Sequence, residues 1–145
     1  MATAAGRRDV EEGSRFAPAF GPDGLIVAVA VDAASKAVLM VARMNRQALD
    51  ATLETGVAHY WSRSRGKLWR KGETSGETQR VIRMLTDCDQ DTLVLEVEVR
   101  GRGATCHTGR ASCFYRAVET GPDGTARLVT VDDRRLFDPA TVYGD

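Results

Sequence analysis

Three cysteines, Cys88, Cys106 and Cys113, are the residues of this 145-residue chain whose type and spacing best suit metal chemistry. Only residues 107–112 separate the second from the third, and Gly109 lets this segment fold back so that both sulfurs reach one ion. Three thiolates leave one tetrahedral position of zinc open, as in catalytic sites where bound water becomes a nucleophile. The alternative is three small buried side chains, because free cysteine is often buried.

Carboxylates alternate with the first cysteine, in the order Asp87, Cys88, Asp89, Gln90, Asp91. In an extended conformation the three aspartates share one side of the backbone, while Cys88 points to the other. Clustered carboxylates repel one another unless a cation neutralises them, and hard oxygen ligands suit magnesium. The alternative is a solvated acidic turn between two strands.

The same alternation has a consequence for the zinc ligands. If Cys88 points away from its own aspartates, it does not meet Cys106 and Cys113 of the same chain. A zinc site shared across a two-fold homodimer would remove this difficulty and would generate two such sites.

The composition of the chain limits the classes of protein to which it can belong. Apolar residues make up 43% of the chain, and the formal net charge is zero, so we expect no nucleic-acid partner and no membrane-surface partner. No apolar run approaches the ~20 residues that cross a bilayer, and residues 1–15 lack the apolar core of a secretory signal. An odd number of cysteines then favours thiols in a reduced, cytoplasmic protein.

The elements that must position these residues are mainly strands. We expect a flexible N-terminal arm over residues 1–15 and a single domain over 16–145. Residues 25–31 and 37–42 are predicted to form a hairpin. A helix is predicted to follow, capped by Asn45 and ended by Gly56, with Leu49 and Leu53 on one face. Further strands are predicted at 57–62, 81–86 and 92–100, with a last core strand at 113–119.

Two other segments complete this prediction. Residues 63–67 read as a polar loop, and the spacing of Thr74 and Glu77 predicts a short helix after Thr74. The expected fold is therefore a mainly β, β-rich α+β domain, with a mixed or antiparallel sheet or barrel-like core and one or two short helices.

Several longer strings follow the order found in one known family. They are WSRSR at 61–65, LWRKGETSG at 68–76, DCD at 87–89, CHTG at 106–109 and SCFY at 112–115. Through these strings the chain resembles phosphoribosyl-AMP cyclohydrolase of histidine biosynthesis, from about residue 25 to residue 116. The strings are long and unusual, and jointly they are highly specific.

The resemblance implies a hydrolase that acts on a cyclic amidine. It would open the purine ring of 1-(5-phosphoribosyl)-AMP between N1 and C6 by zinc-activated water, giving the formimino-AICAR ribotide. It also implies a homodimer that uses zinc and magnesium. By matching positions, zinc would be held by Cys88 of the partner with Cys106 and Cys113, and magnesium by the aspartates Asp87, Asp89 and Asp91. The family usually has glycine where Gln90 stands.

Ring opening also needs proton transfer and phosphate binding. His107 is the candidate acid/base because histidine titrates near neutral pH, and its alternative role is to orient a ligand by a hydrogen bond. His59 is interpreted as structural, and the alternative is a substrate-facing position. Two phosphates suit hydroxyls, guanidinium groups and a helix N-terminus. The candidate substrate-binding residues are Trp61, Ser62, Arg63, Ser64, Arg65, Lys71, Thr74, Ser75 and Gly76.

Simpler alternatives remain for these residues. The arginine-rich segment could be a solvated turn, and Trp61 and Trp69 could pack in the core rather than stack on the purine. A zinc-dependent nucleobase deaminase is a competing enzyme, although its HxE and PCxxC pattern is absent. A non-catalytic module is the other competitor, in which His107 would complete a closed structural zinc site.

Overall fold

The computed structural model describes residues 4–144, so residues 1–3 of the expected arm and Asp145 lie outside the described part. Within this range the elements are α1 (Ala4–Glu12), β1 (Ile26–Asp32), β2 (Val38–Met44), α2 (Arg46–Thr55), β3 (His59–Ser62), β4 (Lys67–Arg70), β5 (Gln79–Thr86), β6 (Thr92–Val99), β7 (Arg116–Thr120), β8 (Ala126–Thr130) and α3 (Pro139–Tyr143). Strands predominate, as the sequence predicts for a β-rich α+β fold.

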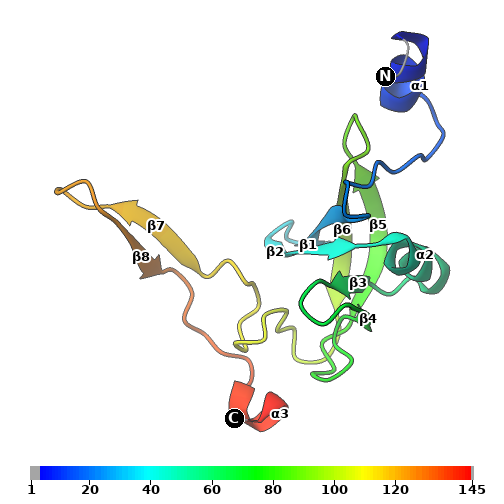
Figure 1. The fold of residues 1–145 in the computed structure, drawn as a ribbon. Coiled ribbons are helices and arrows are strands. Elements are labelled where there is room, and N and C mark those ends of the chain that lie inside the picture. Colours follow the sequence, from blue (N-terminus) through cyan, green and yellow to red (C-terminus); the bar gives the residue numbers. More distant parts are fainter. Residues whose placement is uncertain (1–3, 145) are drawn as a thin grey trace.

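A four-stranded mixed sheet forms the centre of the molecule, in the order β2-β1-β6-β5 (Figure 1). β1 pairs antiparallel with β2 and parallel with β6, and β6 pairs antiparallel with β5. The predicted hairpin and the predicted strands at 81–86 and 92–100 are therefore confirmed. Strands β3 and β4 form a second, two-stranded sheet, and no sheet closes into a barrel within residues 4–144.

The period of two predicted for residues 92–100 is visible in the burial of β6. Leu93, Leu95 and Val97 are fully buried, and they pack in one apolar cluster with Ile26 and Ala28 of β1. Burying such side chains contributes about 1.5–3 kcal/mol each, which makes this face the main source of the sheet's stability.

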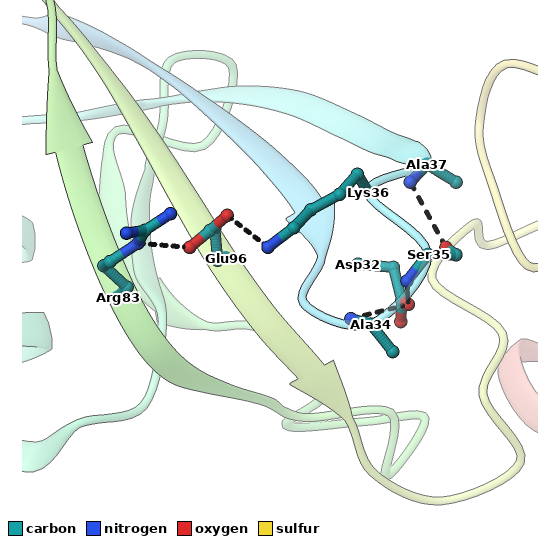
Figure 2. A network of polar contacts seen from close by, with 7 residues as sticks. All are labelled: Asp32, Ala34, Ser35, Lys36, Ala37, Arg83 and Glu96. Carbon is teal, nitrogen blue, oxygen red and sulfur yellow. Dashed lines mark hydrogen bonds and ion pairs between the residues drawn. The ribbon is translucent and has the colours of Figure 1, made fainter.

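Glu96 is the exception on the opposite face of β6, because it is only 6% exposed. Figure 2 shows the carboxylate between two cations: Arg83 Nε donates to one oxygen at 2.5 Å and Lys36 Nζ to the other at 2.6 Å. These hydrogen bonds, first that of Arg83 and then that of Lys36, lower the pKa of Glu96 to about 2. In the turn before Lys36, Asp32 accepts the backbone N–H of Ser35 at 2.7 Å.

Helix α2 begins and ends at the predicted residues. The Asn45 side chain accepts the backbone N–H of Ala48 at 2.8 Å, and Gly56 takes a left-handed conformation with φ of 74°. Leu49 is fully buried against the sheet, whereas Leu53 is 55% exposed. Only the first of the two leucines therefore serves the core of the single chain.

The helix predicted after Thr74 is wrong. Residues 71–76 form turns, and Gly72 and Gly76 have φ of 84° and 81°, which a right-handed helix does not allow. The Glu77 carboxylate, which would have closed the capping box, is engaged by a distant loop instead. The polar loop is also shorter than predicted, because β4 begins at Lys67.

The prediction of a last core strand at 113–119 is also wrong. Strand β7 begins only at Arg116, and it pairs with β8 in a separate hairpin that projects from the rest of the molecule (Figure 1). Val118 in this strand is 71% exposed. Only the start of the segment touches the central sheet, where the Cys113 N–H donates to the carbonyl of Leu39 at 2.8 Å.

Helix α1 occupies part of the expected N-terminal arm, for which the sequence predicts no regular element. The flexibility predicted for this arm stays a prediction. None of the helices within residues 4–144 has the length and apolar character needed to span a bilayer.

Candidate functional site

The loop between Cys106 and Cys113 folds back on itself, as the glycine between them predicts. The Cys106 N–H donates to Arg110 O at 3.0 Å, and the Gly109 N–H donates to Cys106 O at 2.9 Å. Gly109 has φ of 91°, and a Cβ atom there would collide with the carbonyl oxygen of Phe137. Glycine is therefore required both for the turn and for the close approach of the C-terminal segment.

This loop brings the two thiols within hydrogen-bonding reach of each other. Cys106 is buried and Cys113 is exposed, and a hydrogen bond from the Cys113 thiol lowers the pKa of Cys106 to about 5. The Thr108 hydroxyl lies 3.1 Å from the same sulfur and favours its thiolate as well. The pKa of Cys113 is raised, because its thiol is the donor to that thiolate and because it is partly desolvated. The pair is therefore prepared to hold one negative charge.

Lys71 supports the cysteine loop through a hydrogen bond to its backbone. Its side chain is 7% exposed, and Nζ donates to Thr105 O at 2.6 Å. Burial lowers the pKa of Lys71, and the negative charge of the neighbouring Cys113 and Cys106 opposes this shift. The ammonium group therefore adds positive charge beside the thiols.

Glu77 holds the beginning of the same loop, a role that the sequence analysis missed. The fully buried carboxylate accepts Arg102 Nε at 2.8 Å, the Gly103 N–H at 2.9 Å and the Ala104 N–H at 3.3 Å. No local pattern connects these residues, because the chain between them forms all of β5 and β6. Glu77 thus fixes the loop to the turn that precedes β5.

A cavity of about 330 Å³ lies beside the Cys113 thiol. Of the predicted site residues, its wall contains Arg65, Lys71, Thr74, Ser75, His107 and Cys113. The remaining wall was not predicted as substrate-binding and consists of Met40, Trp69, Gly72, Glu73, Thr105 and Tyr143. Residues far apart in the sequence therefore line the same cavity as Cys113, including Tyr143 from the C-terminal helix α3.

The other predicted substrate-binding residues do not line this cavity. They are Trp61, Ser62, Arg63, Ser64 and Gly76. Ser62 Oγ accepts the backbone N–H of Arg65 at 3.2 Å, so this hydroxyl shapes the turn that presents Arg65.

Trp69 of β4 contributes one of the aromatic side chains of the cavity wall. The ring of Trp69 packs against that of Tyr60, with centroids 5.4 Å apart, and another part of Trp69 faces the cavity. Trp69 therefore packs against the core and also lines the cavity, and its stacking on a purine stays a prediction.

The two histidines occupy different environments. His107 is exposed on the cavity wall beside Cys113, where a bound molecule could reach its imidazole. The Nδ1 atom of His59 lies 2.8 Å from Val57 O, and this ring does not line the cavity. The geometry of His59 agrees with a structural role.

One buried polar atom in the cavity wall has no partner among the described residues. The Thr105 hydroxyl is buried, and neither a protein donor nor an acceptor contacts it. Such atoms are rare in folded proteins, and a bound ligand or water is the usual partner. Thr105 was not predicted, since nothing in the sequence marks an unsatisfied hydroxyl.

The aspartates form a second cluster, at the turn between β5 and β6. One carboxylate oxygen each of Asp87, Asp89 and Asp91 lies within 4.8 Å of the others. The three carboxylates lie close together as predicted, but a turn brings them together and not an extended backbone, because Gln90 has φ of 57°. The Asp87 carboxylate accepts the N–H of Asp91 at 3.0 Å and that of Thr92 at 3.1 Å, which closes the turn.

The carboxylates of this cluster shift one another's pKa. Hydrogen bonds to Asp87 and Asp89 raise the pKa of Asp91 to about 6. Partial desolvation opposes ionisation of Asp87, but hydrogen bonds from Asp91 and from the Thr92 N–H outweigh it and lower the pKa of Asp87. Three exposed carboxylates that compete for one proton are suited to a divalent cation with oxygen ligands.

Cys88 lies in the same acidic turn and is exposed. Among residues 4–144, the three aspartates are the only set of three or more His, Cys, Asp and Glu side chains close enough to share one metal. Cys88 therefore does not join Cys106 and Cys113 within one chain, as the alternation in the sequence predicts.

Comparisons with known proteins agree with these features. The family model described as phosphoribosyl-AMP cyclohydrolase matches residues 40–115. A phosphoribosyl-AMP cyclohydrolase from Nitrobacter hamburgensis is 57% identical over 97% of this chain and 95% of its own length. Another from Bradyrhizobium sp. is 62% identical over 88% of this chain and 97% of its own length. With the cysteine pair, the acidic turn and this likeness over nearly its whole length, the chain belongs to the phosphoribosyl-AMP cyclohydrolase family.

Proposed function

We propose that this chain hydrolyses the N1–C6 bond of the purine ring of 1-(5-phosphoribosyl)-AMP, giving the formimino-AICAR ribotide of histidine biosynthesis. The observation that carries the proposal is the cavity of about 330 Å³, whose wall combines the Cys113 thiol and His107 with cationic and hydroxyl side chains. The relatives that match this chain over most of its length are named for this activity.

The cysteine pair fits zinc. The hydrogen bond from Cys113 and the lowered pKa of Cys106 support this assignment, because thiolate is the form that binds metal. When bound, zinc would supply a Lewis acid that makes water nucleophilic at neutral pH. The two sulfurs would hold the ion at the cavity wall, and the nearby Lys71 ammonium group would favour the thiolate form of Cys113.

A second copy of the chain would supply the third thiol. Cys88 is exposed and lies away from the other two cysteines, so it is available to the partner subunit's pair. Large apolar side chains that remain exposed on the central sheet and on α2 support a homodimer. They are Val38, Val41, Leu53, Ile82 and Leu85.

The acidic turn fits magnesium. Asp87, Asp89 and Asp91 offer three hard oxygen ligands in one small volume, and a divalent cation would relieve their repulsion. The ion would hold this turn, and with it Cys88, in a defined conformation.

The remaining wall residues suit the organic substrate. Arg65, Lys71 and the hydroxyls of Thr74 and Ser75 would bind the phosphates, and Trp69 would face the purine. Water adds its oxygen to C6, the N1–C6 bond breaks, and N1 takes up a proton. His107, on the cavity wall, would move this proton.

An assay of the purified protein with phosphoribosyl-AMP, zinc and magnesium tests this function. We expect the ultraviolet absorbance to change as the purine ring opens, without release of ammonia. Ammonia release would favour a deaminase, and the absence of any turnover would contradict the proposed function.

The two histidines of the chain provide a matched pair of variants. His107→Gln should lower kcat by about 100-fold, since proton transfer by a positioned side chain contributes at least this factor. His59→Gln should retain nearly full activity, because His59 does not line the cavity. A pH–rate profile separates the roles: loss of one limb in His107→Gln indicates proton transfer, and an unchanged profile indicates orientation of a ligand.

A further inference from the structure

The side chain of Gln90 connects the acidic turn to the N-terminal arm. Its Oε1 accepts the backbone N–H of Ala17 at 2.7 Å, and its Nε2 donates to Val10 O at 2.9 Å and to Arg15 O at 3.3 Å. The backbone carbonyl of the same residue accepts the N–H of Ala19 at 2.7 Å. One residue of the turn therefore holds both sides of the arm segment 10–19.

The backbone at this position is unfavourable for glutamine. Gln90 has φ of 57°, a left-handed conformation that glycine adopts without steric cost, yet the side chain is 4% exposed and its amide is fully engaged. Its own N–H donates to Asp87 O at 3.1 Å and so helps to close the turn. The conformational cost is offset by contacts that glycine could not make.

The arm and the turn also enclose a common hollow. It has a volume of about 270 Å³, and its walls include Val10, Arg15 and Phe16 from the arm and Asp87 and Cys88 from the turn. In Figure 1 the chain that follows α1 descends beside the tip of the β5–β6 hairpin, where this turn lies. The segment after α1 thus borders one of the three carboxylates, Asp87, and the exposed thiol of Cys88.

We propose that Gln90 is a positioning residue that holds arm residues 10–19 against the acidic turn and thereby arranges the three carboxylates for a divalent cation. The proposal rests on the magnesium role proposed above. The carboxylates repel one another before the metal arrives, so a free turn would open, and anchoring it lowers the cost of bringing the ligands together. The site would then depend on the N-terminal arm as well as on the aspartates.

Two substitutions separate the side chain from the backbone. Gln90→Gly removes every side-chain contact and relieves the left-handed backbone. Gln90→Met removes the same hydrogen bonds but keeps the bulk and the backbone preference of a residue with a Cβ atom. An effect common to both variants is therefore caused by loss of the Gln90 amide group and not by the backbone flexibility of glycine.

Amide hydrogen exchange of the full chain reports whether the arm is held. In both variants we expect the Ala17 N–H to exchange about tenfold faster, because it loses its acceptor. The Ala19 N–H should change less, because its acceptor is the backbone carbonyl that every residue carries. Unchanged exchange at Ala17 in both variants would overturn the anchoring.

Titration with magnesium alone, without substrate, then tests the effect on the site. We expect both variants to bind magnesium about fivefold more weakly than the wild type. Equal affinity in all three proteins would overturn the positioning role while leaving the proposed reaction intact. If the wild-type chain binds no magnesium, the inference and the magnesium part of the proposed function both fail, and turnover of phosphoribosyl-AMP tests the rest independently.

Discussion

The cysteine loop, residues 101–113, and the acidic turn, residues 87–91, lie at opposite ends of β6, and they are held in different ways. The loop is supported by the buried charged side chains of Lys71 and Glu77, which come from another part of the chain. The turn is exposed and is closed mainly by its own Asp87 carboxylate. The proposed zinc site thus depends on tertiary contacts, and the proposed magnesium site depends largely on local sequence.

This difference explains why the two sites should respond differently to substitution. A turn that its own side chains close depends chiefly on its immediate neighbours, among them Gln90, which links it to the N-terminal arm. A loop held by distant side chains loses its geometry when any of them is removed. The thiol pair should therefore be sensitive to residues that touch no metal, and the carboxylates should be sensitive to their immediate neighbours.

The largest effect should follow from Cys106→Ser, which removes a proposed zinc ligand. We expect loss of bound zinc and a fall in turnover of more than about 100-fold, while magnesium affinity stays unchanged. Asp89→Asn is the matched variant at the other site, where magnesium affinity should fall and zinc content should stay. Metal analysis and calorimetric titration measure both, and a Cys106→Ser protein with full activity would contradict the zinc mechanism.

Gly109→Ala should be the next most severe change. The left-handed backbone and the close Phe137 carbonyl leave no room for a Cβ atom, so we expect a loss of about 3 kcal/mol in the free energy of unfolding. Urea denaturation checks this value, with Gly124→Ala as control, because that glycine is also left-handed but has open space around it. Equal losses in both variants would show that the approach of Phe137 is unimportant.

Glu77→Gln should weaken the cysteine loop without touching a thiol. The amide keeps one oxygen acceptor but loses its charge opposite Arg102, and we expect a loss of about 2 kcal/mol and a lower zinc affinity. Magnesium affinity should be the same as in the wild type. If zinc affinity stays unchanged while stability falls, Glu77 supports the fold but does not position the thiols.

These long-range supports mark the limit of what the sequence predicts. The α2 helix follows from its own Asn45 and Gly56, and the acidic turn from one short string, because local contacts determine both. The contacts of Lys71 with Thr105 and of Gly109 with Phe137 depend on how distant segments meet. The turn at Gly76 replaced the predicted helix for the same reason, since Glu77 is recruited by the loop.

The smallest effect should come from Glu96→Gln, in the strand between the two sites. Because the pKa of Glu96 is lowered from 4.5 to about 2, its stabilisation is complete above about pH 4.5 and disappears as the pH falls through about 2. The variant should therefore unfold at a lower temperature than the wild type at pH 7, and the difference should vanish near pH 2. Both metal affinities should stay unchanged, and an equal difference at both pH values would contradict the ionic origin.

The sharing of the zinc site between two copies of the chain is tested most directly by mixing two inactive variants. Cys88→Ser and Cys106→Ser should each be inactive alone, because each lacks a ligand in both sites of its homodimer. After unfolding and refolding together, about half of the dimers are mixed, and each mixed dimer carries one intact site, so about a quarter of the wild-type activity should return. Absence of any recovery, with mixed dimers demonstrated by mass spectrometry, would contradict a zinc site completed by Cys88 of the partner subunit.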